Sequence, residues 1–234
     1  MNKNERKFIK NMFDKIAPWY DFLNRFLSLR QDVSWRKKAV KSLELKTKNP
    51  KVLDMACGTC DIGLEILKQN KTAQITGADF SWEMLKFSKK KIGIKNKSDK
   101  FSLVSSNALF SPFKDQTFDA VTIAFGIRNI VNRKKALENF YSSLKKGGKI
   151  AVLELTTPEN KFLKTIYLFY FLKILPAIGG LFSKNYSAYT YLPQSVINFP
   201  SSQEFLKIME SAGFKNLKYK NFTFGICTLF TGEK

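Results

Sequence analysis

The spacing of apolar side chains changes near residue 50. Before that point, apolar residues recur three and four positions apart, which is typical of amphipathic helices. Runs of this kind cover Phe8–Ile16, Tyr20–Leu29 and Trp35–Leu45. Pro18 separates the first two runs, and Asn49-Pro50 follows the third, where the residue before proline disfavours helix. We therefore predict that residues 1–49 are helical.

After residue 50, short apolar runs alternate with helical spacing. These runs lie at 51–55, 74–79, 101–105, 118–125 and 150–155. The run at 118–125 is continuously apolar, as in a strand buried on both faces. Alternation of strands and helices predicts an α/β fold with a doubly wound, mostly parallel sheet and a ligand site at the carboxyl ends of the strands.

Capping residues mark the ends of the predicted helices. Asp61 is expected to cap the helix after the first strand, and Ser81 to cap the next helix. A helix over 133–145 is expected to stop at Gly147-Gly148, because glycine readily adopts the conformation that ends a helix.

The last part of the chain predicts a helix and a hairpin. The helix covers 203–211 and ends near Gly213, and strands at 217–222 and 226–231 are expected to pair antiparallel around Gly225. With the five runs above, these two strands predict a seven-stranded sheet.

Residues 158–200 interrupt the alternation. The segment Phe162–Phe182, which includes Phe169, is strongly apolar, but Lys164 and Lys173 interrupt it. A membrane span needs ~20 largely uncharged residues, and Pro176, Gly179 and Gly180 would break one. We predict an inserted helical lid. Its apolar face packs on the protein's own sheet, on a second subunit, or against a membrane.

The strongest compositional signal is a formal net charge of +21, from 40 lysines and arginines against 19 acidic residues. Such a charge fits an anionic lipid surface or nucleic acid, or simply lysine at solvated positions. The lysine cluster at 86–100 contains a single aromatic residue, Phe87, and not the series of interleaved aromatic residues found in a single-strand nucleic-acid groove. We therefore expect no nucleic-acid partner, although an RNA-binding protein is kept as a rival hypothesis.

Three cysteines and no histidine limit the chemistry. Cys57 and Cys60 form a C-x-x-C without a second ligand pair, so we expect no metal site, and a redox pair stays open. The first six residues lack the apolar stretch of a secretory signal, which favours a cytoplasmic location.

A glycine loop follows the first predicted strand. Gly58 stands 21 positions before Asp79, close to the ~20 residues that separate a nucleotide loop from the acid that binds a ribose. The full G-x-G-x-x-G of dinucleotide sites is absent. S-adenosylmethionine has no pyrophosphate to cradle, so it suits such a loop.

Several motifs together identify a family. Residues 52–59 and 77–81 resemble the first two motifs of class I methyltransferases. Residues 13–21, 107–113, 124–129, 144–154, 191–200 and 212–214 resemble the ubiquinone/menaquinone biosynthesis C-methyltransferases, so the resemblance covers nearly the whole chain. Ala124–Asn129 is its most specific part.

The resemblance implies a class I, Rossmann-like methyltransferase fold in a single domain. In it, 1–49 form an N-terminal helical lid, 50–157 the cofactor-binding core, 158–200 a helical substrate insert, and 201–234 the C-terminal helix and hairpin. It also implies S-adenosylmethionine as cofactor and a polyprenyl quinol as substrate. The substrate is demethylmenaquinol or a ubiquinone-type benzoquinol. A membrane-bound substrate further implies peripheral association with the inner face of the cytoplasmic membrane, and a homodimer is left open.

The same resemblance implies roles for particular residues. Arg128 and Asn129 would be catalytic, and the substrate would contact Tyr20, Arg128 and Phe169. The cofactor contacts would be Asp54, Gly58, Thr59, Asp79, Asn107 and Ala108.

Two departures from the family pattern affect the expected chemistry. Cys60 replaces a residue that is usually glycine and would crowd the methionine end of the cofactor. Residues 228–233 lack a histidine that the family tends to carry, so the base must be a carboxylate, a tyrosine or a water chain. Arg128 would stabilise the phenolate that forms when a quinol hydroxyl loses its proton.

Overall fold

The computed structural model describes residues 3–174 and 186–234. The predicted breakers Pro176, Gly179 and Gly180 therefore lie outside the described residues. The strands are β1 (Lys51–Met55), β2 (Gln74–Asp79), β3 (Phe101–Ser105), β4 (Phe118–Ala124), β5 (Leu144–Leu155), β6 (Lys215–Phe222) and β7 (Cys227–Glu233).

Helices precede, connect and follow these strands. The α-helices are α1 (Lys3–Ile16), α2 (Tyr20–Leu27), α3 (Gln31–Ser42), α4 (Asp61–Gln69), α5 (Trp82–Ile94), α6 (Arg133–Ser143), α7 (Lys161–Phe169), α9 (Tyr186–Ile197) and α10 (Ser202–Ser211). Short turns of helix are η1 (Ala17–Trp19), η2 (Ser98–Lys100), η3 (Ile127–Asn129), the π-helical η4 (Tyr170–Ile174) and η5 (Thr223–Gly225).

All seven strands form one sheet in the order β3-β2-β1-β4-β5-β7-β6. The first five strands pair in parallel, and β7 is antiparallel to both β5 and β6. Chain order reverses direction across the sheet between β1 and β4, which is where a doubly wound sheet opens a crevice for a ligand. The predicted fold class, sheet and terminal hairpin are confirmed.

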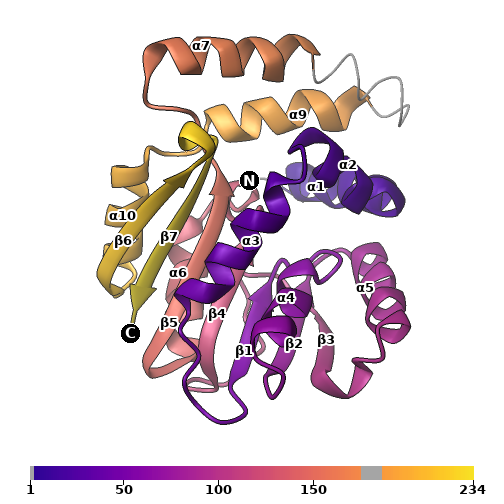
Figure 1. Ribbon diagram of the computed structural model, residues 1–234, viewed down its shortest axis with the longest axis vertical. Coiled ribbons are helices and arrows are strands. Elements are labelled where there is room, and N and C mark those ends of the chain that lie inside the picture. Colours follow the sequence, from indigo (N-terminus) through magenta and orange to yellow (C-terminus); the bar gives the residue numbers. More distant parts are fainter. Residues whose placement is uncertain (1–2, 175–185) are drawn as a thin grey trace.

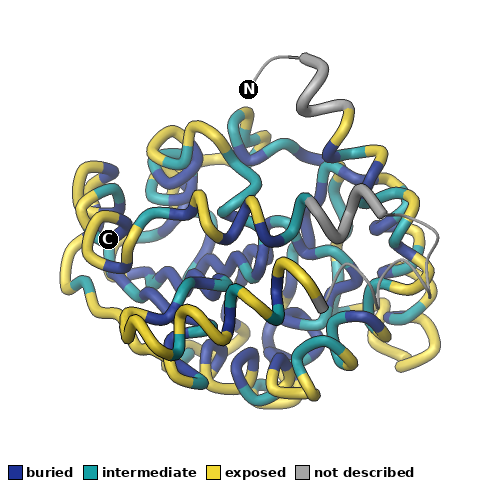
Figure 2. The backbone as a smooth tube through the Cα atoms, turned by 90° about the horizontal axis from the view of Figure 1, so that it is seen from above, coloured by how far each residue is buried: buried dark blue, intermediate teal, exposed yellow. Residues whose placement is uncertain are grey.

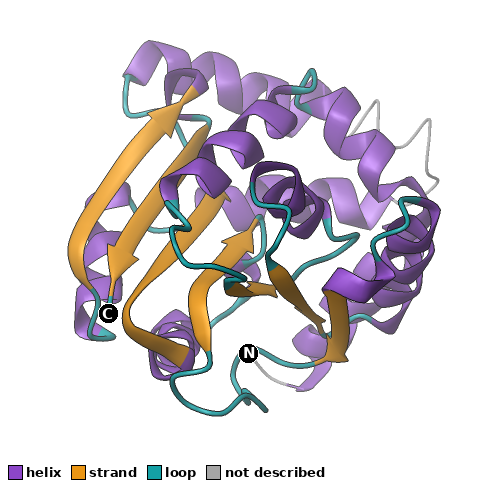
Figure 3. Ribbon diagram, turned by 60° about the horizontal axis from the view of Figure 1, so that its bottom comes forward, coloured by secondary structure: helices purple, strands orange, loops and turns teal. Residues whose placement is uncertain are grey.

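Alternating side chains of the central strands build two apolar layers. Val121, Ile123 and Val152 face one layer, which α6 and α10 cover, whereas Ala120 and Ala151 face the other, which α3 and α4 cover. Figure 3 shows helices on both faces of the sheet. Because both faces are covered there, the central strand β4 is almost continuously buried, as the run at 118–125 predicted.

Two helical segments cover the carboxyl edge of the parallel strands. We call α1, η1 and α2 the N-terminal cover, and α7, η4 and α9 the insert cover. Both lie at the top of Figure 1, and Figure 2 looks down on them. Within the described ranges, no helix is long and apolar enough to cross a bilayer.

Predicted helix boundaries were partly right. Ser81 caps α5 as predicted, because its side chain accepts from the Met84 N–H. The predicted Asp61 cap is wrong: Cys60 occupies the N-cap with φ 62° and makes no capping bond. The Asp61 carboxylate instead accepts from Arg25 and Lys91, because two cations attract it more strongly than the helix terminus does.

The predicted helix stop at Gly147-Gly148 is also wrong. The helix α6 already ends at Ser143, and β5 begins at Leu144. Gly147 has φ +72° and lies where the pairing of β4 with β5 shifts register. The glycine signal therefore marks an irregularity in a strand, where β5 has three more residues than the facing stretch of β4. The third helix also covers residues 31–42 instead of 35–45.

Candidate active site

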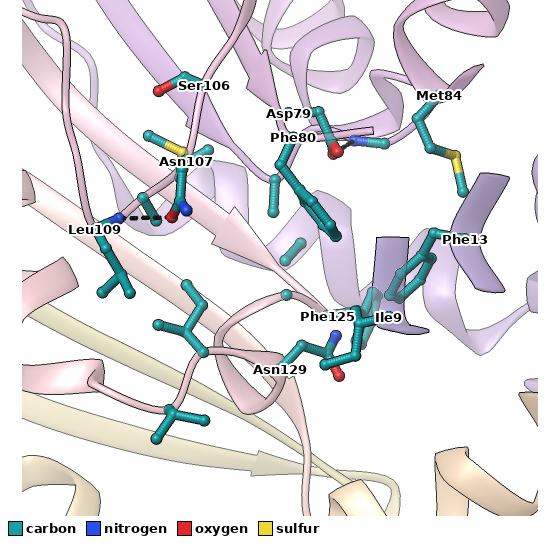
Figure 4. A pocket seen from close by; sticks show the side chains of 18 of the residues that line it. Ile9, Phe13, Asp79, Phe80, Met84, Ser106, Asn107, Leu109, Phe125 and Asn129 are labelled. Atoms are coloured by element: carbon teal, nitrogen blue, oxygen red, sulfur yellow. Dashed lines mark hydrogen bonds between the residues drawn. The ribbon is translucent and has the colours of Figure 1, made fainter. Parts of the chain in front are cut away.

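A small cavity of ≈ 180 Å³ lies at the carboxyl ends of β1, β2 and β4. Four of the predicted cofactor residues lie on its wall, namely Gly58, Asp79, Asn107 and Ala108. The N-terminal cover closes it with Ile9, Phe13 and Tyr20. Figure 4 shows Asp79, Phe80 and Asn107 on this wall, together with Ile9 and Phe13 of the N-terminal cover.

The glycine loop and Asp79 hold each other in place. Gly58 has φ +52°, a conformation that glycine adopts at little cost, and its N–H donates to Asp79 Oδ2 at 2.8 Å. The Ser81 N–H donates to Asp79 Oδ1 at 2.9 Å. Asp79 is 4% exposed, and this burial raises its pKa to about 6. An ionised carboxylate offers about four acceptor positions, so both oxygens can still accept from ribose hydroxyls.

Polar atoms on the cavity wall fit a nucleoside. The Ser106 hydroxyl is buried on this wall, and no described residue hydrogen-bonds it. Asn107 Oδ1 accepts from the Leu109 N–H at 3.0 Å, which leaves its NH₂ group to donate to a ring nitrogen. The residues present therefore fit the adenosine part of S-adenosylmethionine.

Two other predicted cofactor residues lie off this wall. Asp54 is 1% exposed and accepts from the Thr122 hydroxyl at 3.0 Å, and burial raises its pKa to about 7. Thr59 is also buried, and its hydroxyl donates to Asp21 on α2 at 2.5 Å. In this structure, both side chains support the loop from behind.

Cys60 does not narrow the small cavity. Its side chain is fully buried in a cluster with Cys57, Leu85 and Ile92. Its sulfur would lie 3.1 Å from a Cβ atom placed on Gly77, so it packs against β2. The family's usual glycine suits the positive φ at this position, and a cysteine there is strained because of its Cβ. The expected crowding at the methionine end is wrong.

A second, large cavity of ≈ 550 Å³ lies between the two covers. Its wall is mainly apolar and aromatic, with Leu27 and Trp35 on one side and Tyr167, Tyr170 and Phe171 on the other. Phe13, Tyr20 and Phe125 line both cavities. The two cavities therefore share a wall of three aromatic residues, and ligands in them would lie side by side.

Arg128 lies on the wall of the large cavity, on the turn η3. Its Nη1 donates to Glu154 at 2.7 Å and to the Phe125 carbonyl, and its Nε donates to Ser195. The Glu154 charge helps to raise the pKa of Arg128 against the effect of burial, so the guanidinium stays charged. No described residue hydrogen-bonds Nη2. That nitrogen is left to donate to a ligand.

The structure places the remaining predicted substrate and catalytic residues at three different locations. Tyr20 lies in the wall between the cavities, and burial raises its pKa. Asn129 lies on the small cavity and accepts from the Tyr191 hydroxyl at 3.0 Å. Phe169 is 62% exposed and lines neither cavity. The Phe169 side chain lies on the outer face of α7, so its contact with the substrate stays a prediction.

Sequence reasoning missed Glu154, Phe13 and Phe125 as site residues. Glu154 is fully buried at the end of β5. An acid within the apolar run 150–155 is a usable signal, because a buried carboxylate requires a cation or donors. No sequence signal places Phe13 and Phe125 on one wall, since they meet only in the folded chain.

Comparison with known proteins gives the same family as the sequence motifs. The profile of the ubiE/COQ5 methyltransferase family matches residues 1–234. The ubiquinone/menaquinone biosynthesis C-methyltransferase UbiE of Geotalea daltonii is 48% identical, over 97% of this chain and 96% of that protein.

Two further comparisons extend this assignment. The demethylmenaquinone methyltransferase of Thermus thermophilus is 40% identical over 95% of this chain and all of that protein. A SAM-dependent methyltransferase of Aquifex aeolicus shares the fold, with TM-score 0.62 and 18% identity over 84% of this chain and 88% of that one. The chain belongs to the ubiE/COQ5 methyltransferase family and, as the sequence predicts, is an S-adenosylmethionine-dependent methyltransferase.

Proposed function

We propose that the protein transfers a methyl group from S-adenosylmethionine to a ring carbon of a polyprenyl quinol, converting demethylmenaquinol to menaquinol. The observation that carries the proposal is the large aromatic cavity, which shares a wall with the cofactor's small cavity. Its size and apolar lining suit an aromatic ring that carries a hydrocarbon chain. A ubiquinone-type benzoquinol is the second candidate, because the relative from Geotalea daltonii is named for both quinones.

The chain's own residues supply binding, orientation and charge. The cofactor supplies an electrophilic methyl group on its sulfonium. Asp79, Ser106 and Asn107 hold the nucleoside in the small cavity. The shared aromatic wall keeps water away and places the ring beside the methyl group, where ~3–3.5 Å is needed for in-line transfer.

Arg128 prepares the ring carbon for attack. A quinol carbon becomes a better nucleophile when the neighbouring hydroxyl loses its proton, and the Arg128 charge stabilises the resulting phenolate. Glu154 neutralises part of that charge, but it also fixes the guanidinium on the cavity wall. After transfer, the ring carbon gives its own proton to water, which restores the aromatic phenolate, and the phenolate oxygen then takes up a proton from water to give the quinol.

Product analysis tests the reaction. The purified protein is incubated anaerobically with S-adenosylmethionine and short-chain demethylmenaquinol, with a matched short-chain benzoquinol in parallel. Mass spectrometry should detect a gain of one methyl group on the naphthoquinol ring. Methylation of the benzoquinol alone would favour the second candidate, and no methylation of either would contradict the proposal.

We also propose that the insert cover lies against an anionic membrane, where a polyprenyl quinol resides. Four large apolar side chains of α7 and η4 are exposed at spacings of three or four residues. We call them the α7 stripe: Phe162, Ile166, Phe169 and Leu172. Lys161, Lys164 and Lys173 are exposed beside it. An apolar stripe flanked by lysines is typical of helices that lie in a membrane interface.

Vesicle co-sedimentation tests this placement. The protein should bind anionic vesicles at low salt, less at high salt, and several-fold less in a Phe169→Ser, Leu172→Ser variant that keeps its unfolding temperature. Phe110→Ser is the matched control, because Phe110 is 70% exposed but belongs to the loop before β4. No vesicle binding at low salt would contradict the placement. A dimer that the double variant dissociates, measured by light scattering, would assign the stripe to a second copy.

A further inference from the structure

Tyr167 carries a buried hydroxyl that no described residue hydrogen-bonds. The side chain is 6% exposed, and it lies on the wall of the large cavity. Burying a hydroxyl without a partner costs free energy, because its bonds to water are lost. Such groups in a folded protein call for an explanation, and a ligand that completes the hydrogen bond provides one.

The position of the Tyr167 ring is well defined. It stacks on Phe171 with ring centroids 4.7 Å apart, and it belongs to the apolar cluster that contains Met12, Leu23 and Val196. This cluster joins both covers. The ring is therefore held at a fixed place by packing, and the hydroxyl has no hydrogen bond of its own to a described residue.

The charges near Tyr167 make its hydroxyl a donor. Burial raises the pKa of Tyr167, and the positive charge of Arg128 lowers it by a smaller amount. The hydroxyl therefore keeps its proton at neutral pH. Arg128 lies on the same wall and carries only donors. Two donors on one wall favour a ligand with an oxygen that accepts hydrogen bonds.

We propose that the Tyr167 hydroxyl donates a hydrogen bond to a ring oxygen of the acceptor and thereby makes the large cavity selective for oxygenated aromatic rings. This inference rests on the proposed function, because it assumes that the acceptor ring binds in the large cavity. Tyr167 touches the substrate, but it takes no part in the transfer. Its contribution is to orient the ring.

Two probes separate recognition of oxygen from recognition of an apolar ring. The first is 2,3-dimethyl-1,4-naphthoquinone, in which methyl groups already occupy both free ring carbons of the quinone. The second is 2,3-dimethylnaphthalene, which has the same two methyl groups and no oxygens. Equilibrium dialysis with S-adenosylhomocysteine present measures both affinities. The wild-type protein should bind the quinone at least tenfold more tightly.

Tyr167→Phe removes a single oxygen atom and keeps the stacked ring. The variant should bind the naphthoquinone five- to tenfold more weakly and the hydrocarbon unchanged. Its unfolding temperature should stay equal or rise, since the unpaired hydroxyl is gone. Tyr219→Phe is the matched control, because Tyr219 lies on β6 and lines neither cavity. It should leave both affinities unchanged.

The outcomes separate this inference from the proposed function. If the wild-type protein prefers the quinone and Tyr167→Phe keeps that preference, the proposed function stands and the role of Tyr167 is refuted. Equal weakening of both probes would show a packing role and refute it as well. If the wild-type protein prefers neither probe, the large cavity does not select quinones, and both proposals fail.

Discussion

The two helical covers above the sheet are held by different forces. The N-terminal cover meets the core through charged and hydroxyl groups: Asp14 accepts from Ser81, Asp21 from Thr59 and Lys91, and Arg25 donates to Asp61. The insert cover instead packs Tyr167, Phe171 and Val196 into an apolar cluster, which it shares with Met12 and Leu23 of the N-terminal cover. Its described side-chain hydrogen bonds to the core are those of Ser195 with Arg128 and of Tyr191 with Asn129.

This difference matches what must pass beneath each cover. The cofactor is polar and charged, so a cover held by ion pairs can exchange those pairs for water when it opens. The quinol is apolar. A cover held by apolar packing opens most readily when its internal contacts can be replaced by contacts with the apolar part of a membrane. Opening of the N-terminal cover should therefore depend on the salt concentration, and opening of the insert cover on the presence of lipid.

The largest effect on turnover is expected from a substitution of Arg128, the charged residue on the mainly apolar wall of the large cavity. Arg128→Lys keeps a positive charge beside buried Glu154 but loses the three-way contact with Glu154, Phe125 and Ser195. Turnover should fall roughly 100-fold, since stabilisation of the phenolate is lost in the transition state. The dissociation constant of S-adenosylmethionine, measured by calorimetry, should change less than threefold.

Lysine is preferred to alanine at this position because of the buried ion pair. Arg128→Ala would leave Glu154 buried without its cation, at a cost of about 3–5 kcal/mol of folding stability. Thermal unfolding should show that Arg128→Lys stays folded at the assay temperature. Equal losses in turnover and cofactor affinity would place Arg128 in the cofactor site, and the comparison of the two halves would break down.

A smaller effect, confined to the polar half, is expected at Asp79. Asp79→Asn should weaken S-adenosylmethionine binding at least tenfold, since charge-assisted bonds to the ribose contribute about 1.5–3 kcal/mol each. Binding of the quinone probe should be unchanged. An unaltered cofactor affinity would show that Asp79 only braces the Gly58 loop.

The pKa of Asp79 also predicts a pH dependence. Burial raises that pKa to about 6, so the carboxyl binds a proton as the pH falls below that value. The protonated form accepts fewer hydrogen bonds, so cofactor affinity should be constant from pH 7 to 8 and decrease below pH 6. The slope of log affinity against pH cannot exceed one for a single group. Asp79→Asn should abolish this dependence, and a variant that retains it would assign the titration to another group.

The smallest effect concerns the ion pairs of the N-terminal cover. Asp21→Asn removes the carboxylate that joins Thr59 to Lys91, and S-adenosylhomocysteine should dissociate about two- to fivefold faster in stopped-flow measurements. Added salt should speed release from the wild-type protein and have less effect on the variant. Lys86→Gln is the control, because its partner Glu83 lies on the exposed side of α5. Release that is insensitive to salt would refute this part of the comparison.

The sequence predicted the sheet well, and four of its predicted cofactor residues line the small cavity, because both features depend on local pattern. Apolar runs alternate with capped helices, and the loop and acid that bind a nucleoside follow consecutive strands. Gly58 and Asp79 stand 21 positions apart in the sequence and yet share a hydrogen bond, because β1 and β2 are adjacent. A short-range motif therefore positions half of the site.

The other half could not be predicted in the same way. The wall between the cavities joins Phe13 and Tyr20 from the N-terminal cover to Phe125 from the end of β4, and no spacing rule connects them. Phe169 and Tyr167 lie two residues apart in one apolar helix, but only the packing of α7 decides which of them lines the cavity. Apolar character predicted the insert, and it did not reveal which face points inward.

The shared aromatic wall has a thermodynamic consequence. A ligand that orders Phe13, Tyr20 and Phe125 from one side changes the free energy of binding on the other side. Linkage requires this coupling to be reciprocal: the factor by which S-adenosylhomocysteine alters affinity for a quinone equals the factor by which the quinone alters affinity for S-adenosylhomocysteine. Three rings between two cavities would thus make binding of the two substrates cooperative. After methyl transfer, S-adenosylhomocysteine and the methylated quinol would then each strengthen the binding of the other.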